Sequence, residues 1–361
     1  MARLEVSYSF WSGKKVLISG HSGFKGSWLS IWLKSLGADV IGVSLDPPSS
    51  PSLYDKAHIS DDIISHRQDI RNLKGLTKIF QKYKPEIVFH LAAQSLVKYS
   101  YSNPIETYET NVMGTLNILE AIKNVGSVKA AIMVTSDKCY ENTERYEGYV
   151  EDDPMGGYDP YSSSKGASEL LISSYRNSFF TDINLEKNNT AIASVRAGNV
   201  IGGGDWAKDR LIPDIINAFQ KKEKVMIRNP HAVRPWQHVL EPLSGYMRLA
   251  ELLFIEGSTH AEAWNFGPND EDARPVEWIV ERIAYLWGEN SKWSKDKNFH
   301  EHEAAFLKLD CSKALKNLNW KPKWTLEEAL TKVVAWHKEE YLNPSKCREI
   351  CLNQIQNYQN K

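Results

Sequence analysis

The chain lacks several features that would mark special classes of protein. Cysteine occurs only four times in 361 residues, without the spacing of a metal site or a disulfide framework. No apolar run approaches the ~20 residues needed to span a bilayer. The first thirteen residues lack the charged-then-apolar order of a signal peptide. These absences predict a cytoplasmic protein with no metal and no membrane partner.

The chain also lacks an excess of charge of either sign. Its 44 basic and 45 acidic residues give a formal net charge of −1. No global field therefore draws it to nucleic acid, and any anionic ligand must be held by a local cluster of basic side chains. The length favours one large domain or two closely packed domains.

The first half alternates short apolar runs with helical patterns, which is typical of a parallel sheet built from βαβ units. Strand-like runs occupy residues 15–19, 39–43, 87–91, 130–134 and 191–195, and residues 28–33 have helical spacing. This predicts an α/β fold with a doubly wound parallel Rossmann sheet. We expect residues 1–198 to form this domain, with a return segment at about 236–266. The remainder of 199–361 would form a smaller C-terminal substrate-binding domain.

A glycine-rich turn follows the first predicted strand and opens the first predicted helix. Glycine lets such a turn tighten and lets the backbone approach a pyrophosphate, whose charge is met by the helix N-terminus. The spacing is GxxGxxG, and a turn in a non-binding α/β domain is the alternative. The expected cofactor contacts are Gly20, Ser22, Gly23, Phe24, Lys25 and Gly26.

Asp46 lies at the end of the second predicted strand, twenty residues beyond Gly26. A carboxylate there accepts hydrogen bonds from an adenosine ribose and repels a 2′-phosphate, which favours NAD over NADP. Because two prolines follow, Asp46 could equally be a turn residue. Further cofactor contacts are expected at later strand ends and an adjoining helix, namely Asp69, Ile70, Leu91, Ala92, Ala93, Gln94 and Asn111.

The groups best suited to chemistry follow the run 130–134. Ser136, Asp137 and Lys138 come directly after this predicted strand, and Tyr161 and Lys165 are four residues apart, hence on one face of a helix. Separately they could be a solvated charge pair and an ordinary helix face. Together, behind a glycine turn, they supply an acid, two possible bases and an orienting hydroxyl.

These residues, in this order, resemble the extended short-chain dehydrogenase/reductase family from Gly20 to at least Phe266. Within that family the pair Ser136-Asp137 resembles the nucleotide-sugar 4,6-dehydratases, whereas epimerases carry Ser-Ser or Ser-Thr. Three further stretches match in register: 151–157, 198–206 and 228–239. The resemblance implies a lyase that binds NAD and converts CDP-D-glucose to its 4-keto-6-deoxy form, a precursor of deoxysugars in surface polysaccharides such as O-antigen. A dehydratase of a UDP-linked sugar and a catalytically silent NAD-binding module are the alternatives.

The resemblance also implies roles for the five central residues. Tyr161, its pKa lowered by Lys165 and a cationic nicotinamide, would take the proton of the C4 hydroxyl. Lys165 would also hold the nicotinamide ribose, and Ser136 would bind the C4 oxygen. Asp137, as a neutral acid, would protonate the departing C6 hydroxyl.

Lys138 departs from the commoner dehydratase pattern, which has glutamate at this position as the base for C5. A lysine can serve only when neutral, and its free pKa is near ~10.4. We expect Lys138 to be the C5 base, with Glu141 or a lysine-oriented water as rivals.

A nucleotide sugar brings a pyrophosphate, which suits the fork of an arginine. By resemblance Arg234 is the main phosphate ligand and Asn199 the second, although Asn199 could simply terminate a strand. Arg210 and Arg228 are further candidates that could instead be surface charge. The family suggests a homodimer or homotetramer built from the predicted helices at 108–123 and 161–180.

Overall fold

The computed structural model describes residues 8–181, 189–288, 292–296 and 306–361. One parallel sheet is built from β1 (Lys15–Ser19), β2 (Asp39–Ser44), β3 (Ile64–Arg67), β4 (Ile87–His90), β5 (Ala130–Val134), β6 (Ala191–Arg196) and β11 (Ala263–Asn265). Their order across the sheet is β11-β6-β5-β4-β1-β2-β3, and every neighbouring pair is parallel. The predicted doubly wound α/β fold is confirmed.

The strands recognised from the sequence are the buried ones. Both β5 and β6 read as continuous apolar or small-residue runs, because helices cover both faces of a parallel sheet. The edge strand β3 has the sequence Ile-Ser-His-Arg and is largely exposed. It carries no apolar run, and the sequence did not reveal it.

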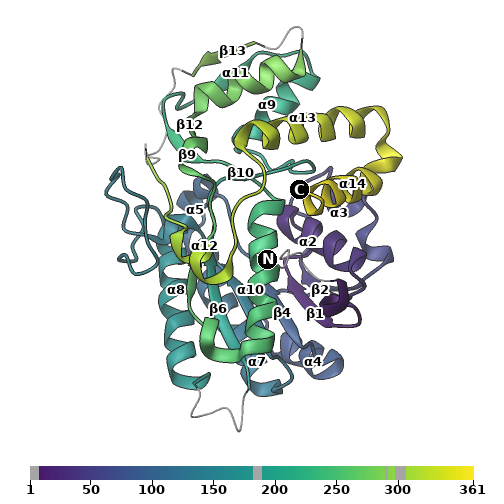
Figure 1. Cartoon of the computed structure of the whole chain (residues 1–361), viewed down its shortest axis with the longest axis vertical. Coiled ribbons are helices and arrows are strands. Elements are labelled where there is room, and N and C mark those ends of the chain that lie inside the picture. The colour runs from purple at the N-terminus through teal and green to yellow at the C-terminus, as the bar shows by residue number, and fades with distance from the viewer. Residues whose placement is uncertain (1–7, 182–188, 289–291, 297–305) are drawn as a thin grey trace.

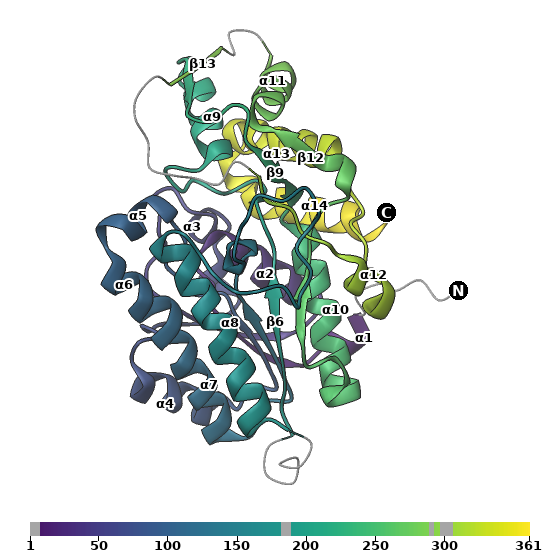
Figure 2. The ribbon, with the colours of Figure 1, turned by 90° about the vertical axis from the view of Figure 1, so that its left-hand side faces the viewer.

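Helices lie on both faces of the sheet (Figures 1 and 2). One face is covered by α2 (Phe24–Ser35) and α10 (Leu240–Glu256), and α14 (Cys347–Gln359) belongs to the same apolar cluster. The other face is covered by α4 (Leu73–Tyr83), α7 (Gly114–Val125) and α8 (Pro160–Phe179). The sheet is therefore the middle of three layers, with an apolar core on each side.

A smaller lobe stands above the carboxyl ends of the strands, at the top of Figure 1. Its helices are α9 (Leu211–Gln220), α11 (Val276–Trp287) and α13 (Leu326–Leu342), which share a separate apolar core. Short strand pairs join them: β8 (Val225–Ile227) with β13 (Trp293–Lys295), and β9 (Val233–Pro235) with β12 (Ala273–Pro275). The lobe covers the edge of the sheet at which ligands bind in open α/β folds.

The remaining elements are short. They are α1 (Tyr8–Trp11), α3 (Leu53–Lys56), α5 (Val97–Ser102), α6 (Pro104–Tyr108), α12 (Ser312–Leu318), the pair β7 (Val200–Ile201) and β10 (Gln237–His238), the π-helical turn η2 (Glu109–Met113), the 3₁₀ turns η1 (Ile59–Asp61), η3 (Asp137–Cys139), η5 (Gly257–His260), η6 (Asp270–Asp272) and η7 (Pro344–Lys346). The division into two domains at residue 198 stays a prediction. Across the described ranges, no helix has both the length and the apolar character to cross a membrane.

Candidate active site

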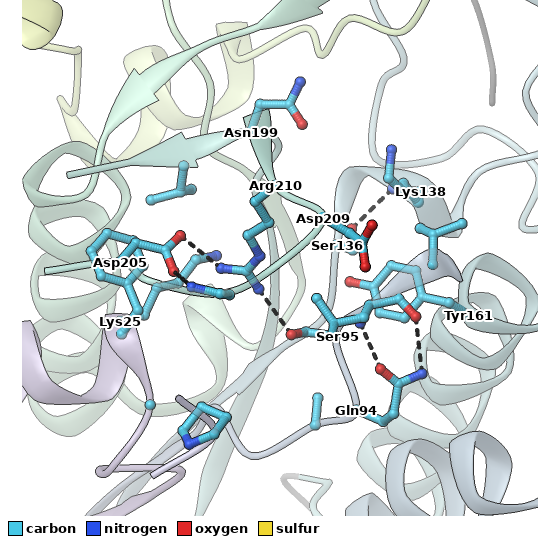
Figure 3. Close-up of a pocket in the computed structure, with 18 of the residues that line it drawn as sticks. Lys25, Gln94, Ser95, Ser136, Lys138, Tyr161, Asn199, Asp205, Asp209 and Arg210 are labelled. Atoms are coloured by element: carbon cyan, nitrogen blue, oxygen red, sulfur yellow. Dashed lines mark hydrogen bonds and ion pairs between the residues drawn. The ribbon is translucent and has the colours of Figure 1, made fainter. Parts of the chain in front are cut away.

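A large cavity, about 1150 Å³ in volume, lies between the sheet and the smaller lobe. Its floor includes the ends of β1 and β4, where the order of the strands reverses, which is the usual ligand site of a doubly wound sheet. The residues expected at the site line this cavity, with Asn111 as the exception. Figure 3 shows Ser136, Lys138 and Tyr161 on one side of the cavity, with Asp205 and Arg210 on the other.

The glycine turn between β1 and α2 packs tightly against neighbouring protein backbone. Gly20 has a φ of +81°, which favours glycine. A Cβ on Gly26 would lie 2.1 Å from the Gly20 carbonyl oxygen, and one on Gly20 would lie 2.7 Å from the Ala92 nitrogen. The turn is thus packed against its own backbone, with the first turn of α2 facing the cavity. These residues fit the pyrophosphate of a dinucleotide.

Two carboxylates expected near the adenosine end lie at the rim. Asp46 follows β2, is largely exposed and is ion-paired with Arg67 at the end of β3. Asp69 accepts a hydrogen bond from the Arg71 backbone and pairs with its guanidinium at 2.7 Å, which holds the pKa of Asp69 below its usual value. Both side chains line the cavity.

Asn111 lies behind the cavity wall and differs from the expectation. It is buried in η2, and its side chain accepts from the Gln94 amide at 2.8 Å. Its Nδ2 donates to the Gln94 carbonyl at 3.0 Å and to Ser164 Oγ at 2.8 Å. Through these bonds Asn111 holds the loop after β4 against α8, and it does not line the cavity.

The start of α8 is fixed so that Tyr161 and Lys165 face the cavity. The Asp159 carboxylate accepts from the Ser162 amide at 2.9 Å, and Pro160 occupies the first helical position, where its missing N–H costs nothing. Burial lowers the pKa of Lys165 to about 8, and the nearby charge of Lys25 adds to this effect.

Burial raises the pKa of Tyr161 to about 12, and a hydrogen bond with Ser136 only partly opposes it. This differs from the lowered value expected from the sequence. The reason is that the phenol is deeply buried and the protein supplies too little nearby positive charge. A lowered value therefore depends on the charge of a bound cationic ring.

Ser136 and Asp137 form the turn after β5. Ser136 caps η3, accepting from the Lys138 amide at 3.2 Å and donating to Asp137 Oδ1 at 3.0 Å. Asp137 is only 2% exposed, and its Oδ2 has no hydrogen-bond partner among the described residues. A buried polar atom without a partner at the wall of a cavity is suited to a ligand hydroxyl.

Gly198 makes the space that this carboxyl group occupies. A Cβ at this position would lie 2.0 Å from Asp137 Oδ2 and 3.2 Å from Pro235 Cγ. The glycine follows β6, which is the next strand in the chain after β5 and its neighbour in the sheet. From the sequence pattern alone, Gly198 is only one member of a longer motif.

Lys138 and Glu141, the two side chains considered as the base that takes the C5 proton, lie in different places. Lys138 is half-buried and lines the cavity, whereas Glu141 is exposed and does not. Glu141 instead lies beside Gly156, where a Cβ would meet its Cα at 2.8 Å. The geometry favours Lys138 over Glu141.

Arg210 spans the opening of the cavity and joins the two lobes. Its Nη1 pairs with Asp205 Oδ2 at 3.0 Å, and its Nη2 donates to Ser95 Oγ at 2.9 Å (Figure 3). Neither Asp205 nor Ser95 was predicted as a site residue. Asp205 directly follows the three glycines 202–204, and this position was the only sequence signal for it. Its pairing with Arg210, five residues later, depends on the conformation of the loop between them.

The other candidates for the phosphates lie on the smaller lobe. Arg234 on β9 is 7% exposed and donates to the Val233 carbonyl at 3.1 Å, and Arg228 donates to the Asp209 carbonyl at 3.2 Å. Asn199 has a φ of +32°, which asparagine tolerates better than most residues. All three line the cavity, so positive charge collects at its upper wall.

The part of the chain that the structure describes contains no candidate metal centre. No group of three or more His, Cys, Asp or Glu side chains there could hold a metal ion.

A glycine turn and several arginines that line one cavity are typical of a class of proteins: α/β enzymes that bind a dinucleotide beside a phosphorylated substrate. The comparison with known families is more specific. A family model described as GDP-mannose 4,6 dehydratase matches residues 17–333, and the chain belongs to this family.

Curated relatives support the same placement. A CDP-glucose 4,6-dehydratase of Salmonella typhimurium is 56% identical over 92% of this chain and 93% of its own length. A dTDP-glucose 4,6-dehydratase of Haemophilus influenzae is 27% identical over 89% of this chain and 97% of its own. The resemblance to extended short-chain dehydrogenase/reductases is confirmed.

Solved structures show the same fold. A UDP-glucose 4-epimerase of Thermotoga maritima, with UDP-glucose, has a TM-score of 0.76 at 23% identity, covering 91% of this chain and 99% of that one. A dTDP-glucose 4,6-dehydratase of Bacillus anthracis, in complex with NAD, has a TM-score of 0.74 at 21% identity, covering 91% and 97%. At such identities the likeness concerns the fold.

Proposed function

We propose that this chain is an NAD-dependent hydro-lyase that converts CDP-D-glucose to CDP-4-dehydro-6-deoxy-D-glucose. The observation that carries the proposal is the meeting of the glycine turn, Tyr161, Ser136 and Asp137 at one cavity. The 56% identity to a CDP-glucose 4,6-dehydratase supports both the reaction and the nucleotide. The product would serve deoxysugar synthesis for surface polysaccharides.

The residues present fit NAD, as the packing of the glycine turn indicates. When bound, NAD⁺ accepts a hydride from C4 of the sugar and returns it at C6. Asp46 and Asp69 would bind the adenosine half, and Lys165 the nicotinamide ribose. The carboxylate of Asp46 favours NAD over NADP, although its partner Arg67 reduces the repulsion of a 2′-phosphate.

The chain's own groups would divide the acid–base work between them. Tyr161 would accept the proton of the C4 hydroxyl, which Ser136 holds in place. Lys138 would take the proton from C5. Asp137 would protonate the leaving C6 hydroxyl through Oδ2, the oxygen that has no partner within the described chain.

The phosphates would be held at the upper wall by Arg234, Asn199, Arg228 and Arg210. Arg210 would leave or share its present partners, since a pyrophosphate is a stronger acceptor than the Ser95 hydroxyl. In this arrangement residues 1–198, with the return segment, would carry the cofactor, and the smaller lobe would carry the nucleotide sugar.

The test is an assay of purified protein with CDP-, UDP-, dTDP- and GDP-glucose, following the alkali-dependent absorbance of 4-keto sugars. Product from CDP-glucose alone supports the proposal. Product from UDP-glucose instead would favour the UDP-sugar alternative, and bound NAD without product from any substrate would favour a silent module. Lys138→Met should abolish exchange of the C5 hydrogen with solvent while NAD stays bound; retained exchange would remove Lys138 from its role.

A homodimer or homotetramer is also proposed. Apolar side chains are exposed along the stretches expected to form the interface, 108–123 and 161–180: Tyr108, Met113, Leu170 and Phe179. They lie on α6, η2 and α8, which form one flank of the molecule in Figure 2. Sedimentation of the purified chain tests this, and a monomer at micromolar concentration would contradict it. The cytoplasmic location stays a prediction.

A further inference from the structure

A buried ion pair lies beneath the cavity, outside the groups assigned so far. Glu169 on α8 and Arg196 on β6 are 2.8 Å apart, and their side chains are 3% and 4% exposed. Neither residue lines the cavity, so neither is placed to touch a substrate. A buried ion pair is a costly way to stabilise a core, since apolar residues often do as well or better. The partners of this pair indicate what it does.

The pair holds the residue just before the acid-bearing turn. Thr135 Oγ1 donates to Glu169 Oε1 at 2.5 Å, and the Thr135 amide donates to the Val195 carbonyl at 2.9 Å. Since Ser136 and Asp137 follow immediately, the start of their turn is tied to both α8 and β6.

The pair also holds the residue just after that turn. Arg196 Nη1 donates to Tyr140 Oη at 2.7 Å, and its guanidinium lies over the Tyr140 ring at 4.9 Å. The Tyr140 hydroxyl in turn donates to Asn265 Oδ1 at 2.7 Å on β11. The segment 136–139 is therefore fixed at both ends by one pair of charges.

The Glu169 carboxylate lies on α8, the helix that also carries the Tyr161 phenol. Glu169 lies four residues after Lys165 and eight after Tyr161, so all three lie near one face of α8. Burial alone would raise the pKa of Glu169, but Arg196 and the hydrogen bonds from Arg196, Thr135 and Ser194 hold it below its usual value. Glu169 thus stays ionised and its three bonds persist.

From this geometry we infer that Glu169 and Arg196 are positioning residues that set the distance between Tyr161 and Asp137. The inference rests on the proposed function, in which Tyr161 acts at C4 and Asp137 at C6. If the link between helix and turn loosens, the C4 step keeps its base on α8 and loses only the alignment of Ser136. The water-loss step loses the alignment of both its acid, Asp137, and its base, Lys138. The two steps should therefore respond unequally.

The variants for the test are Thr135→Val and Glu169→Gln. Thr135→Val removes one bond and leaves the ion pair, whereas Glu169→Gln breaks the pair. The double variant Glu169→Gln/Arg196→Met serves if the single one does not fold, because removing both charges avoids an unpaired one. The matched control is Glu251→Gln. Glu251 is a buried carboxylate on α10 that accepts from Trp11 Nε1 at 2.7 Å and pairs with Arg248 at 3.6 Å.

In a single turnover of CDP-glucose, Thr135→Val and Glu169→Gln should slow product formation by roughly ten- to a hundredfold, since a misplacement of about 1 Å costs on the order of 10²-fold. The absorbance of reduced nicotinamide should rise and persist, because C4 oxidation outpaces water loss. KM should change little. Glu251→Gln should lower the melting temperature without this accumulation. Equal slowing of both steps, or unchanged kcat at lowered stability, would overturn the inference.

A second readout needs neither substrate nor cofactor. Amide hydrogen exchange of residues 135–140 should be faster in Thr135→Val and Glu169→Gln than in the wild type, and unchanged in Glu251→Gln. Unchanged exchange in the first two variants would overturn the inference even if catalysis is slowed. A wild-type protein that makes no product from any nucleotide sugar refutes the proposed function instead.

Discussion

Substitution of Gly198 by alanine tests the placement of Asp137, the proposed catalytic acid, most directly. Gly198 has no left-handed φ, so its backbone accepts alanine and only space is at issue. The new methyl group would lie 2.0 Å from Asp137 Oδ2 and 3.2 Å from Pro235 Cγ. The carboxyl oxygen is the first atom that must move.

The size of the effect follows from the required displacement. An ordinary Cβ contact begins at 3.4 Å, so Oδ2 must retreat by about 1.4 Å. A misplacement of about 1 Å costs on the order of 10²-fold in rate, which is roughly 2.7 kcal/mol of activation free energy. The crowding itself should cost about 1–3 kcal/mol of folding stability.

The assay is steady-state dehydration of CDP-glucose, together with thermal unfolding. Gly198→Ala should lower kcat roughly a hundredfold and leave the affinity for NAD close to that of the wild type. The control is Gly267→Ala, whose nearest neighbours are side-chain atoms at 3.2 and 3.6 Å that can adjust. Wild-type kcat in Gly198→Ala would show that Asp137 Oδ2 does not take part in the reaction as described.

Two further predictions concern the cofactor site. Gly26→Ala places a Cβ 2.1 Å from the Gly20 carbonyl oxygen, a backbone atom that can move little. We therefore expect the affinity for NAD, measured by calorimetry, to fall at least about tenfold. Unchanged affinity would show that the turn does not bind the pyrophosphate. The pKa of Lys165 is about 8 in the folded protein and 10.5 in the unfolded chain. Between these pH values the unfolded state binds more protons than the folded state. The stability of the NAD-free protein therefore rises with pH in this range. Lys165→Met should therefore stabilise the NAD-free protein at pH 7, by on the order of 3 kcal/mol, while abolishing activity. This gain, measured by denaturant unfolding, should fade as pH rises from 8 towards 10.5, and a pH-independent difference would contradict the burial of the charge.

The strands of the core were predictable because their signal is local. The apolar run 130–134 coincides with β5 (Ala130–Val134), and 15–19 coincides with β1 (Lys15–Ser19). A strand buried on both faces must be apolar at successive positions, whatever its neighbours are. The exposed edge strand β3 has no such requirement and was missed.

The candidate site was predictable to the extent that the fold forces its parts together. Once the sheet is parallel, residues after β1, β4 and β5 must meet at its carboxyl edge, and the spacing of Tyr161 and Lys165 puts both on one helix face. The pKa of Tyr161 in the folded chain could not be predicted from such local patterns. Its rise to about 12 reflects burial, which depends on everything packed around the phenol.

Local sequence patterns thus specify the buried strands, the glycine turn and the proposed reacting groups. These follow from backbone geometry and from patterns a few residues long. Which groups hold others in place depends on the packing of the whole chain: Asn111 behind Gln94, Arg210 between Asp205 and Ser95, and Gly198 against Asp137. The ties of Thr135 to Glu169 and of Tyr140 to Asn265 join residues 34 and 125 positions apart. Such contacts are fixed by the packing of whole helices on the sheet, which no short pattern encodes.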